Sequence, residues 1–350
     1  MFGLSGRQLG VVGVSVMLVV GSGVSVLFSA SAVVRFVLAG LALAAVAALV
    51  GVATDELGSH VGAGSAGVIQ SSLGNLPELL VSLFALHQGL PKVVQAALIG
   101  SVLSNSLLVL GLAMVAGGLR HGTQSFHSPR ARLTATLTMV AAATLAIPTF
   151  TSALHTHAAR HERTLSLIGA GVLLVIFAAT LPAFLSGVAE RSEARVARWP
   201  LRTTVGILLV AAAGAALTSD WFVAALRPAI ATLHVSQGFV GLVVVAIVGN
   251  AVENVVGVRL FRDNRPDFAI SVILNSSLQV ALALTPILVF ASLFFATSLT
   301  LVFPPLLIVA LLLAAVVGAL VINDGESTWG EVIVLIGLYT VIAASFWWGV

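Results

Sequence analysis

Two short motifs organise the sequence: GNLPE at residues 74–78 and GNAVE at residues 249–253. Each places a glutamate, Glu78 or Glu253, inside a long apolar stretch. A charged side chain at the centre of a membrane helix costs about 2.5–3.5 kcal/mol on insertion scales, so such residues are rare and usually functional. Because the same motif carries this residue twice, we expect the two glutamates to act together near the middle of a membrane.

The composition shows that these motifs lie in a membrane protein. The chain has 350 residues, of which 59% are hydrophobic and 8% charged, and its mean hydropathy is +1.13. Soluble domains contain about 25% charged residues, so a water-soluble fold is excluded. Apolar runs of about 20 residues span a bilayer as helices. Eleven such runs are predicted, at residues 9–29, 32–53, 62–86, 91–118, 131–152, 163–187, 203–225, 238–258, 266–292, 296–321 and 330–349.

The motifs belong to a longer internal repeat. SVLSNSLLVL (101–110) follows the first glutamate, and SVILNSSLQV (271–280) follows the second. The order of the spans gives the two halves opposite directions, as in many secondary transporters. The sequence therefore predicts an all-α polytopic membrane protein of about eleven transmembrane helices, with one extra N-terminal helix and two inverted five-helix repeats. The expected segments are an N-terminal helix within 1–30, a first half at 31–188, a linker at 189–202 and a second half at 203–350.

The distribution of basic residues predicts the orientation. Eleven of the sixteen Lys and Arg residues lie on the side of the N-terminus. The positive-inside rule therefore places the N-terminus and the linker in the cytoplasm and the C-terminus outside, and we expect a bacterial inner membrane. The first run follows Arg7 and also resembles a signal peptide, but its length favours a transmembrane helix. Since the arginines act as topology signals, no nucleic-acid partner is expected; the oligomeric state is left open.

Helix breakers and neutral oxygens surround both glutamates. Glycine and proline interrupt the helical hydrogen-bond pattern and free carbonyl groups that can face a cavity. Carboxylate, amide, hydroxyl and carbonyl oxygens suit a hard cation such as Ca2+. Two close carboxylates repel each other, so that either Ca2+ or protons can neutralise them, which predicts exchange. The helix-breaking residues are Gly74, Asn75, Pro77, Gly249 and Asn250. Further neutral oxygens, each of which helix packing explains equally well but which as a group favour the site, come from Ser72, Ser101, Ser104, Asn105, Asn275, Ser276, Ser277 and Gln279.

Six stretches resemble the calcium/proton exchangers of the calcium:cation antiporter superfamily. Residues 67–86 and 241–258 look like the first and second conserved repeats of that family. The other four stretches are residues 97–118, 267–286, 298–305 and 324–329. The resemblance implies ten core helices plus one at the N-terminus, Glu78 and Glu253 as ion-binding and proton-coupling carboxylates, and alternating access. It implies no cofactor, and Ca2+ and H+ as the transported ions.

Three departures from that family bear on the function. Asn254 follows the second glutamate where the family usually has a histidine, and an amide does not titrate. Gln70 and Ser72 stand where the first repeat usually has Asn and Thr, and the linker at 190–202 is basic rather than acidic. A sodium-coupled or broad-specificity cation exchanger therefore stays open, and a passive cation channel is a weaker alternative. No HExxH or GxSxG motif is present, so an enzyme is not expected.

Acidic and histidine residues at the membrane edge have simpler interpretations. Asp55 and Glu56 precede the first repeat helix, and Asp324 and Glu326 precede the last helix. Because acidic residues favour helix N-termini, we expect them to cap these helices, with a role in the ion's access path as the alternative for the first pair. The histidines of HTHAARH (155–161) have a spacing that permits a transition metal, but we expect them to be ordinary polar loop residues.

Overall fold

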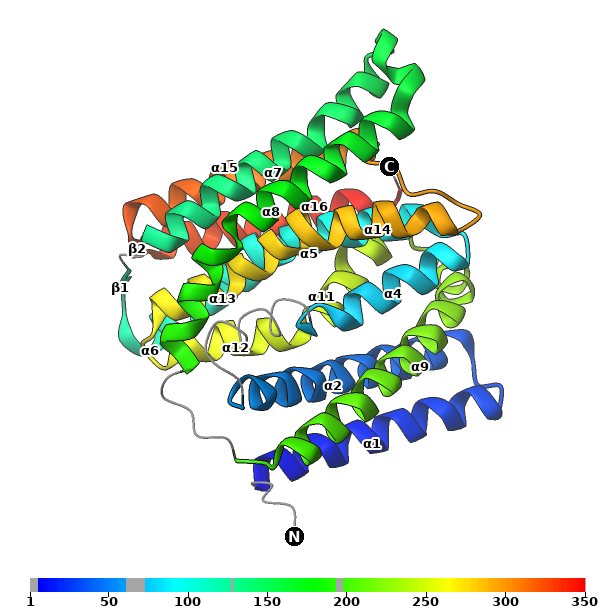
Figure 1. The fold of residues 1–350 in the computed structure, drawn as a ribbon, viewed down its shortest axis with the longest axis vertical. Coiled ribbons are helices and arrows are strands. Elements are labelled where there is room, and N and C mark those ends of the chain that lie inside the picture. The colour runs from blue at the N-terminus through cyan, green and yellow to red at the C-terminus, as the bar shows by residue number, and fades with distance from the viewer. Residues whose placement is uncertain (1–5, 61–72, 127–128, 193–197, 350) are drawn as a thin grey trace. The chain divides into compact units, whose positions relative to one another are not determined.

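The computed structural model describes residues 6–60, 73–126, 129–192 and 198–349, and nearly all of these residues are helical (Figure 1). The α-helices are α1 (Gly6–Leu27), α2 (Ala32–Gly58), α4 (Leu76–His87), α5 (Pro91–Leu103), α6 (Leu110–His121), α7 (Pro129–Ala153), α8 (Glu162–Ser192), α9 (Leu201–Leu233), α10 (Gln237–Phe239), α11 (Ala246–Gly249), α12 (Ala251–Arg262), α13 (Pro266–Gln279), α14 (Thr285–Ala291), α15 (Pro305–Asp324) and α16 (Trp329–Trp347). The π-helices are η1 (Ser104–Val109), η3 (Val240–Val245) and η4 (Val280–Leu284). The 3-10 helices are η2 (His157–His161) and η5 (Ser292–Phe294), and the strands are β1 (Gln124–Ser125) and β2 (Glu326–Ser327).

The length and apolar character of the helices confirm the predicted all-α membrane architecture. Within the described residues, nine helices are long and apolar enough to span a bilayer. A bent pair, Gln237–Gly249 with Ala251–Arg262, makes a tenth span if it is counted as one. The expected span at 62–86 is represented by α4, and residues 61–72 lie outside the described part of the chain. The number eleven and the inverted repeats stay predictions.

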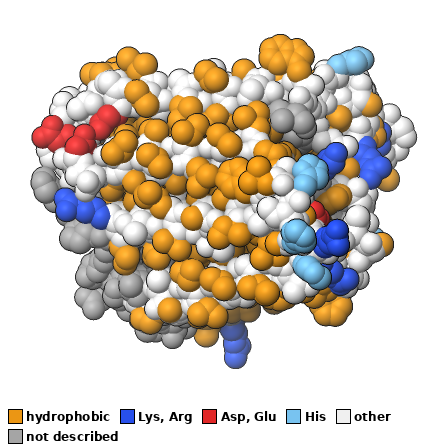
Figure 2. Space-filling view, turned by 90° about the horizontal axis from the view of Figure 1, so that it is seen from above, with side chains coloured by type: hydrophobic (Ala, Val, Ile, Leu, Met, Phe, Trp, Pro, Cys, Tyr) orange, Lys and Arg blue, Asp and Glu red, His pale blue; other side chains and the backbone are white. Residues whose placement is uncertain are grey.

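The surface carries the apolar side chains that contact with lipid requires. Large hydrophobic residues such as Leu154, Val175 and Phe294 are 68–91% exposed. Figure 2 shows one face of the molecule on which hydrophobic side chains cover the middle, while His, Lys and Arg side chains gather toward one border. Charged groups thus lie at the edge of an apolar belt, as expected for a protein embedded in a bilayer.

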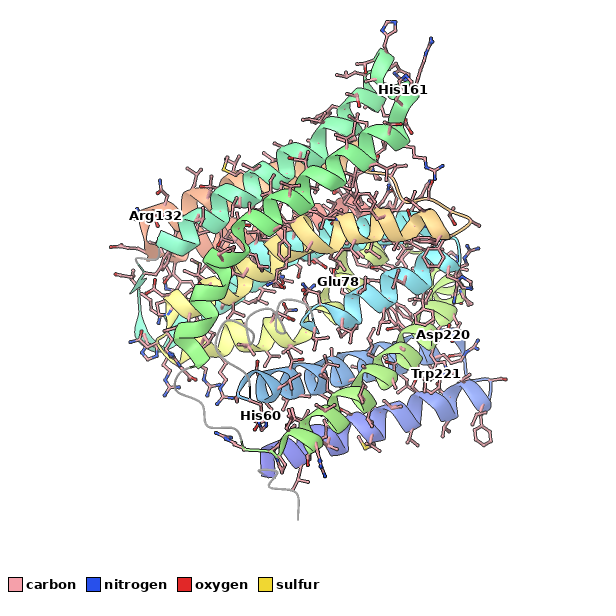
Figure 3. The ribbon with its side chains drawn as sticks, viewed as in Figure 1. His60, Glu78, Arg132, His161, Asp220 and Trp221 are labelled. Atoms are coloured by element: carbon pink, nitrogen blue, oxygen red, sulfur yellow. The ribbon has the colours of Figure 1, made fainter. Side chains whose placement is uncertain are left out.

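The chain forms two compact units and passes from one to the other within α4, within α8 and just after α9. The first unit comprises residues 1–84 and 178–234. In it α2 packs along α9, and α1 packs mainly against α2 (Figure 1). The rings of Phe36 and Phe222 stack with their centroids 4.9 Å apart, and Trp221 of α9 packs against Gly23 of α1 (Figure 3).

The end of α2 corrects the capping prediction for Asp55 and Glu56. Because α2 continues to Gly58, both residues lie in its last turn rather than ahead of a helix. The Glu56 carboxylate accepts hydrogen bonds from the backbone N–H groups of Arg198 and Trp199, and His60 Nε2 lies 2.7 Å from Trp199 O. Glu56 therefore holds the backbone that leads into α9.

The second unit comprises residues 85–177 and 235–350. In it α7 packs against α15, α6 against α12 and α16, and α5 against η3. The contact of α5 with η3 depends on two glycines. A Cβ on Gly100 would lie 2.4 Å from Leu242 O, and a Cβ on Gly241 would lie 2.5 Å from Val93 O. The two backbones therefore touch directly, which any larger residue would prevent.

The segment before α15 corrects the prediction of a helix at 296–321. Residues 296–304 form no helix, and α15 begins only at Pro305. Backbone polar groups inside a membrane protein must find partners, and here they find side chains of neighbouring helices. The hydrogen bonds run from Leu299 N to Ser292 Oγ, from Leu301 N to Ser166 Oγ, from Phe303 N to Thr149 Oγ1, and from Gln95 Nε2 to Thr300 O and Val302 O, at 2.8–3.1 Å.

Contacts among loops of the second unit agree with the predicted alternation of sides. Strand β1 pairs antiparallel with β2. Gln124 Nε2 also donates hydrogen bonds to Phe261 O at 3.2 Å and Asn264 Oδ1 at 2.8 Å. Three loops predicted to lie in the cytoplasm are therefore joined. Figure 3 places Arg132 and His161, predicted to lie on opposite sides, near opposite ends of α7. Which side is cytoplasmic stays a prediction.

The last helix is capped by residues other than those expected. Thr328 accepts a hydrogen bond from Glu331 N, and the Glu331 carboxylate accepts one from Thr328 N, which is a capping box. Asp324 ends α15 and accepts from the backbone N–H of Glu326, so the capping prediction for this pair is wrong. Among the described residues, no group of three or more His, Asp or Glu side chains is arranged to hold a metal ion.

Candidate cation site

The first glutamate lies at the beginning of a helix. A turn at Gly74 and Asn75 immediately precedes α4, and Glu78 lies in the first turn of that helix (Figure 3). Its side chain is only 1% exposed. Pro77 is tolerated here because a first-turn residue needs no intrahelical N–H donor. The positive end of the helix dipole favours a carboxylate at this position.

The second glutamate repeats this arrangement at a break inside a span. The two parts of that span, 237–249 and 251–262, meet at an angle of 65°. Asn250 at the break has φ −102° and ψ 21°, outside the helical region, and follows the buried Gly249. Glu253 then lies in the first turn of α12 and is half-buried. Both Gly-Asn pairs thus stand directly ahead of a helix with a glutamate in its first turn.

Asn250 is the centre of a buried hydrogen-bond network in the second unit. Its Nδ2 donates to Ser101 Oγ and to Ala246 O, both at 2.9 Å. Its Oδ1 accepts from Ser276 Oγ at 3.2 Å and lies 3.5 Å from Asn105 Nδ2, which also donates to Ser276 Oγ at 3.2 Å. The four side chains of this network are at most 5% exposed. The network therefore fixes the break ahead of Glu253 to α5, η1 and α13.

The other predicted supporting residues lie apart from this network or outside the described residues. Ser277 Oγ lies 3.4 Å from Ser106 Oγ, and Asn275 Oδ1 accepts a hydrogen bond from Thr134 Oγ1 of α7 at 3.2 Å. Gln279 is the last residue of α13 and is half-buried. Ser104 is buried at the start of η1, and Gln70 and Ser72 fall within 61–72, which is not described.

Two polar residues that contact predicted site residues were not predicted from the sequence. Ser106 stands at the position of the first motif that Ser276 occupies in the second, so aligning the two motifs would have found it. Thr134 lies in α7, outside both motifs, and no sequence signal marked it. Asn254, which stands where the resemblance leads one to expect histidine, donates from Nδ2 to Ile247 O at 3.5 Å.

A π-helix shapes the first motif at this site. In η1 the N–H of Leu110 reaches back to Asn105 O, five residues earlier, instead of four. Such wide turns are rare, occur singly inside α-helices and are frequent at functional sites. Asn105 therefore reaches Asn250 from a locally widened helix. The resulting surroundings of Glu253 are rich in neutral oxygen atoms, the donor set that suits a hard cation.

Comparison with known proteins places this architecture in a family. The profile of the family described as sodium/calcium exchanger protein matches residues 31–185 and 203–348. A Ca(2+)/H(+) antiporter of Synechocystis is 33% identical, with 89% of this chain and 90% of that protein covered. The Ca(2+)/H(+) antiporter ChaA of Bacillus subtilis is 31% identical, with 89% and 92% covered.

A solved structure agrees with these relatives. The structure of native YfkE superposes with a TM-score of 0.82 at 30% identity, and 95% of this chain and 99% of that chain are covered. The sequence relatives and the structural neighbour therefore match over most of the chain, and the residues matched by the family profile include both glutamate motifs. The chain belongs to the sodium/calcium exchanger protein family and, within it, to the calcium/proton exchangers.

Proposed function

We propose that this chain is a secondary active antiporter that exports Ca2+ from the cytoplasm in exchange for protons by alternating access. The observation that carries the proposal is the placement of Glu78, 1% exposed at a helix start in an apolar protein, together with Glu253 at a helix break held by neutral amide and hydroxyl groups. The names of the relatives from Synechocystis and Bacillus subtilis support the same pair of ions.

The two carboxylates have the central role in this mechanism. Ca2+ is bound by carboxylate oxygens together with carbonyl, amide and hydroxyl oxygens, all of which the Gly-Asn motifs and the Asn250 network offer. When Ca2+ leaves, protons neutralise the carboxylates, because a bare carboxylate in a poorly hydrated place is unfavourable, which favours its protonated form. A transporter that changes its access only in a neutralised state exchanges the two kinds of ion without leak.

The direction of transport follows from the proposed orientation. Eleven of sixteen basic residues lie on the side of the N-terminus, so we place that terminus in the cytoplasm of a bacterium and the C-terminus outside. The inward proton gradient across a bacterial inner membrane then drives Ca2+ outward. No resident cofactor takes part in this mechanism.

The test is Ca2+ uptake by purified protein in liposomes under an imposed proton gradient, with a sodium gradient as a second arm. We expect uptake to follow the proton gradient and to ignore sodium. Glu78→Gln and Glu253→Gln should each reduce uptake at least about 100-fold, because a neutral amide cannot offset the charge of Ca2+ or carry a proton. Glu326→Gln, an exposed acidic residue of β2, is the matched control and should transport normally.

Other outcomes would point elsewhere. Uptake driven by the sodium gradient would replace the proton by sodium as the coupling ion and leave the fold and the carboxylate pair in place. Ca2+ flux that equilibrates without any counter-ion would indicate a passive channel. Full activity in both glutamine variants would remove the proposed site.

A further inference from the structure

Tyr339 is the single tyrosine of the sequence and lies in α16, outside both repeat motifs. Its side chain is 4% exposed, and α16 packs against η1. The buried Tyr339 hydroxyl has no hydrogen bond of ordinary geometry in the described part of the chain. Buried hydroxyl groups without partners are costly, and native proteins contain few of them. Its position next to the π-helix of the cation site therefore calls for an explanation.

Ser104, the first residue of η1, carries the hydroxyl group that can pair with the hydroxyl of Tyr339. It is 0% exposed, and its Oγ is likewise without an ordinary hydrogen bond. Serine inside a helix commonly donates to the carbonyl one turn earlier, which Ser104 does not do. The hydroxyl of Tyr339 faces Ser104 instead. A hydroxyl group can both donate and accept, so a small rotation of either side chain closes this hydrogen bond.

The pair adjoins the residue that holds the helix break. Asn105 follows Ser104 in η1 and donates to Ser276 Oγ at 3.2 Å, while its Nδ2 lies 3.5 Å from Asn250 Oδ1. A π-turn is less favourable than a regular α-turn, so it persists where its surroundings stabilise it. A polar contact to Ser104, the first residue of the π-turn, stabilises the turn directly beside Asn105 and so fixes the direction of the Asn105 side chain.

We propose that Tyr339 is a positioning residue of the cation site: through Ser104 it holds the π-turn that presents Asn105 to Asn250. This inference rests on the proposed function and adds α16 to the elements that shape the site of Glu253. Tyr339 touches no ion in this role. Loss of the Tyr339 hydroxyl weakens Ca2+ binding by the same amount in the resting site and in the transition state of transport. The KM for Ca2+ therefore rises while kcat per folded transporter stays nearly constant.

The test compares Tyr339→Phe, Ser104→Ala and the double variant in liposomes, with initial Ca2+ uptake measured over a range of Ca2+ concentrations. Each single variant should raise KM about three- to ten-fold, the equivalent of one neutral hydrogen bond. The double variant should raise KM no further, because both changes remove the same contact. Thr340→Val is the control: this exposed neighbour donates only within its own helix, to Ile336 O at 2.8 Å, and should leave KM unchanged.

An unchanged KM in Tyr339→Phe would overturn the inference, even if less folded protein were recovered, because that pattern indicates packing alone. Additive effects of the two single variants would overturn it as well. If the wild-type protein exchanged sodium rather than protons for Ca2+, the proposed coupling would fail, but the same KM comparison would still decide the role of Tyr339.

Discussion

The segments 101–110 and 271–280 are identical at five of ten positions but have different structures. In the first, the π-helix η1 begins at Ser104, the fourth residue of the motif. In the second, α13 stays α-helical through Gln279, and the π-helix η4 begins only at Val280, the last residue of the motif. Asn105 and Asn275 hold the same motif position, yet only Asn105 reaches the network of Asn250. Asn275 accepts a hydrogen bond from α7 instead.

The position of the wide turn accounts for this difference. An inserted π-turn adds one residue to the helix, which rotates the following side chains by about 100° relative to a regular α-helix. Asn105 lies within such a turn, whereas Asn275 lies ahead of one. A repeated motif therefore supplies the same residue types to both copies, and the local helix geometry decides which copy serves the second helix break.

The largest loss of stability should come from Gly100, the residue directly before the first motif. Ile270 holds the equivalent position before the second motif. A Cβ on Gly100 would lie 2.4 Å from Leu242 O, so Gly100→Ala must push α5 away from η3. We expect a loss of about 1–3 kcal/mol or more in stability and little folded protein, measured by thermal unfolding in detergent.

Two controls test whether this effect belongs to the helix contact. Ile270→Val should cost about 0.5–1.5 kcal/mol, since it only removes one buried methyl group. Gly337→Ala in α16, where a new Cβ meets nothing within 4 Å, should leave the melting temperature unchanged or raise it. Equal behaviour of Gly100→Ala and Gly337→Ala would contradict the close approach of α5 and η3.

The next largest effect should be a difference in Ca2+ uptake between variants of Asn105 and of Asn275. Asn105→Ala removes the buried donor to Ser276 Oγ and leaves Asn250 Oδ1 with Ser276 Oγ as its donor, at a cost of about 1–3 kcal/mol, and should reduce Ca2+ uptake about ten-fold or more. Asn275→Ala removes the acceptor of one hydrogen bond from Thr134, worth about 0.5–1.5 kcal/mol, and should keep most of the uptake. If both variants lost uptake equally, the two motif copies would be functionally equivalent despite their different structures.

The smallest effect should come from the partner of the second asparagine. Thr134→Val keeps the shape of the side chain and removes the donor to Asn275 Oδ1. We expect a stability loss of about 1 kcal/mol and normal uptake. Thr136→Val, an exposed position whose hydroxyl bonds only to Arg132 O of its own helix, is the control. A strong transport defect in Thr134→Val would show that Asn275 also serves the cation site.

The sequence predicted the helices well where hydropathy alone decides and poorly where side chains replace helical hydrogen bonds. The run at 298–305 is apolar enough for a helix, and its Pro304 and Pro305 are compatible with a helix start. Its extended form depends on Gln95, Thr149 and Ser166, which are distant in sequence. No local pattern contains that information.

The candidate site shows the same limit. The repeated Gly-Asn pairs identified the start of α4 and the break before α12, because glycine and asparagine disfavour a helix interior wherever they stand. The capping prediction for Asp55 and Glu56 is wrong because the apolar run was expected to end at residue 53, whereas α2 continues to Gly58 and the Glu56 carboxylate accepts from the backbone N–H groups of Arg198 and Trp199. The π-turn at Ser104 has no sequence signature, so the different roles of Asn105 and Asn275 were not foreseen.

The pairing of β1 with β2 has a consequence for how the chain is made. Gln124 finds its partners at Phe261, Asn264 and Ser327, which are 137, 140 and 203 residues further along the chain. A ribosome therefore releases the loop around Gln124 long before its partners exist, and the loop cannot complete its contacts until the chain has been synthesised through Ser327. Assembly of the loop is thus a late step of biogenesis, and nascent chains stalled before residue 327 should leave this loop accessible to protease.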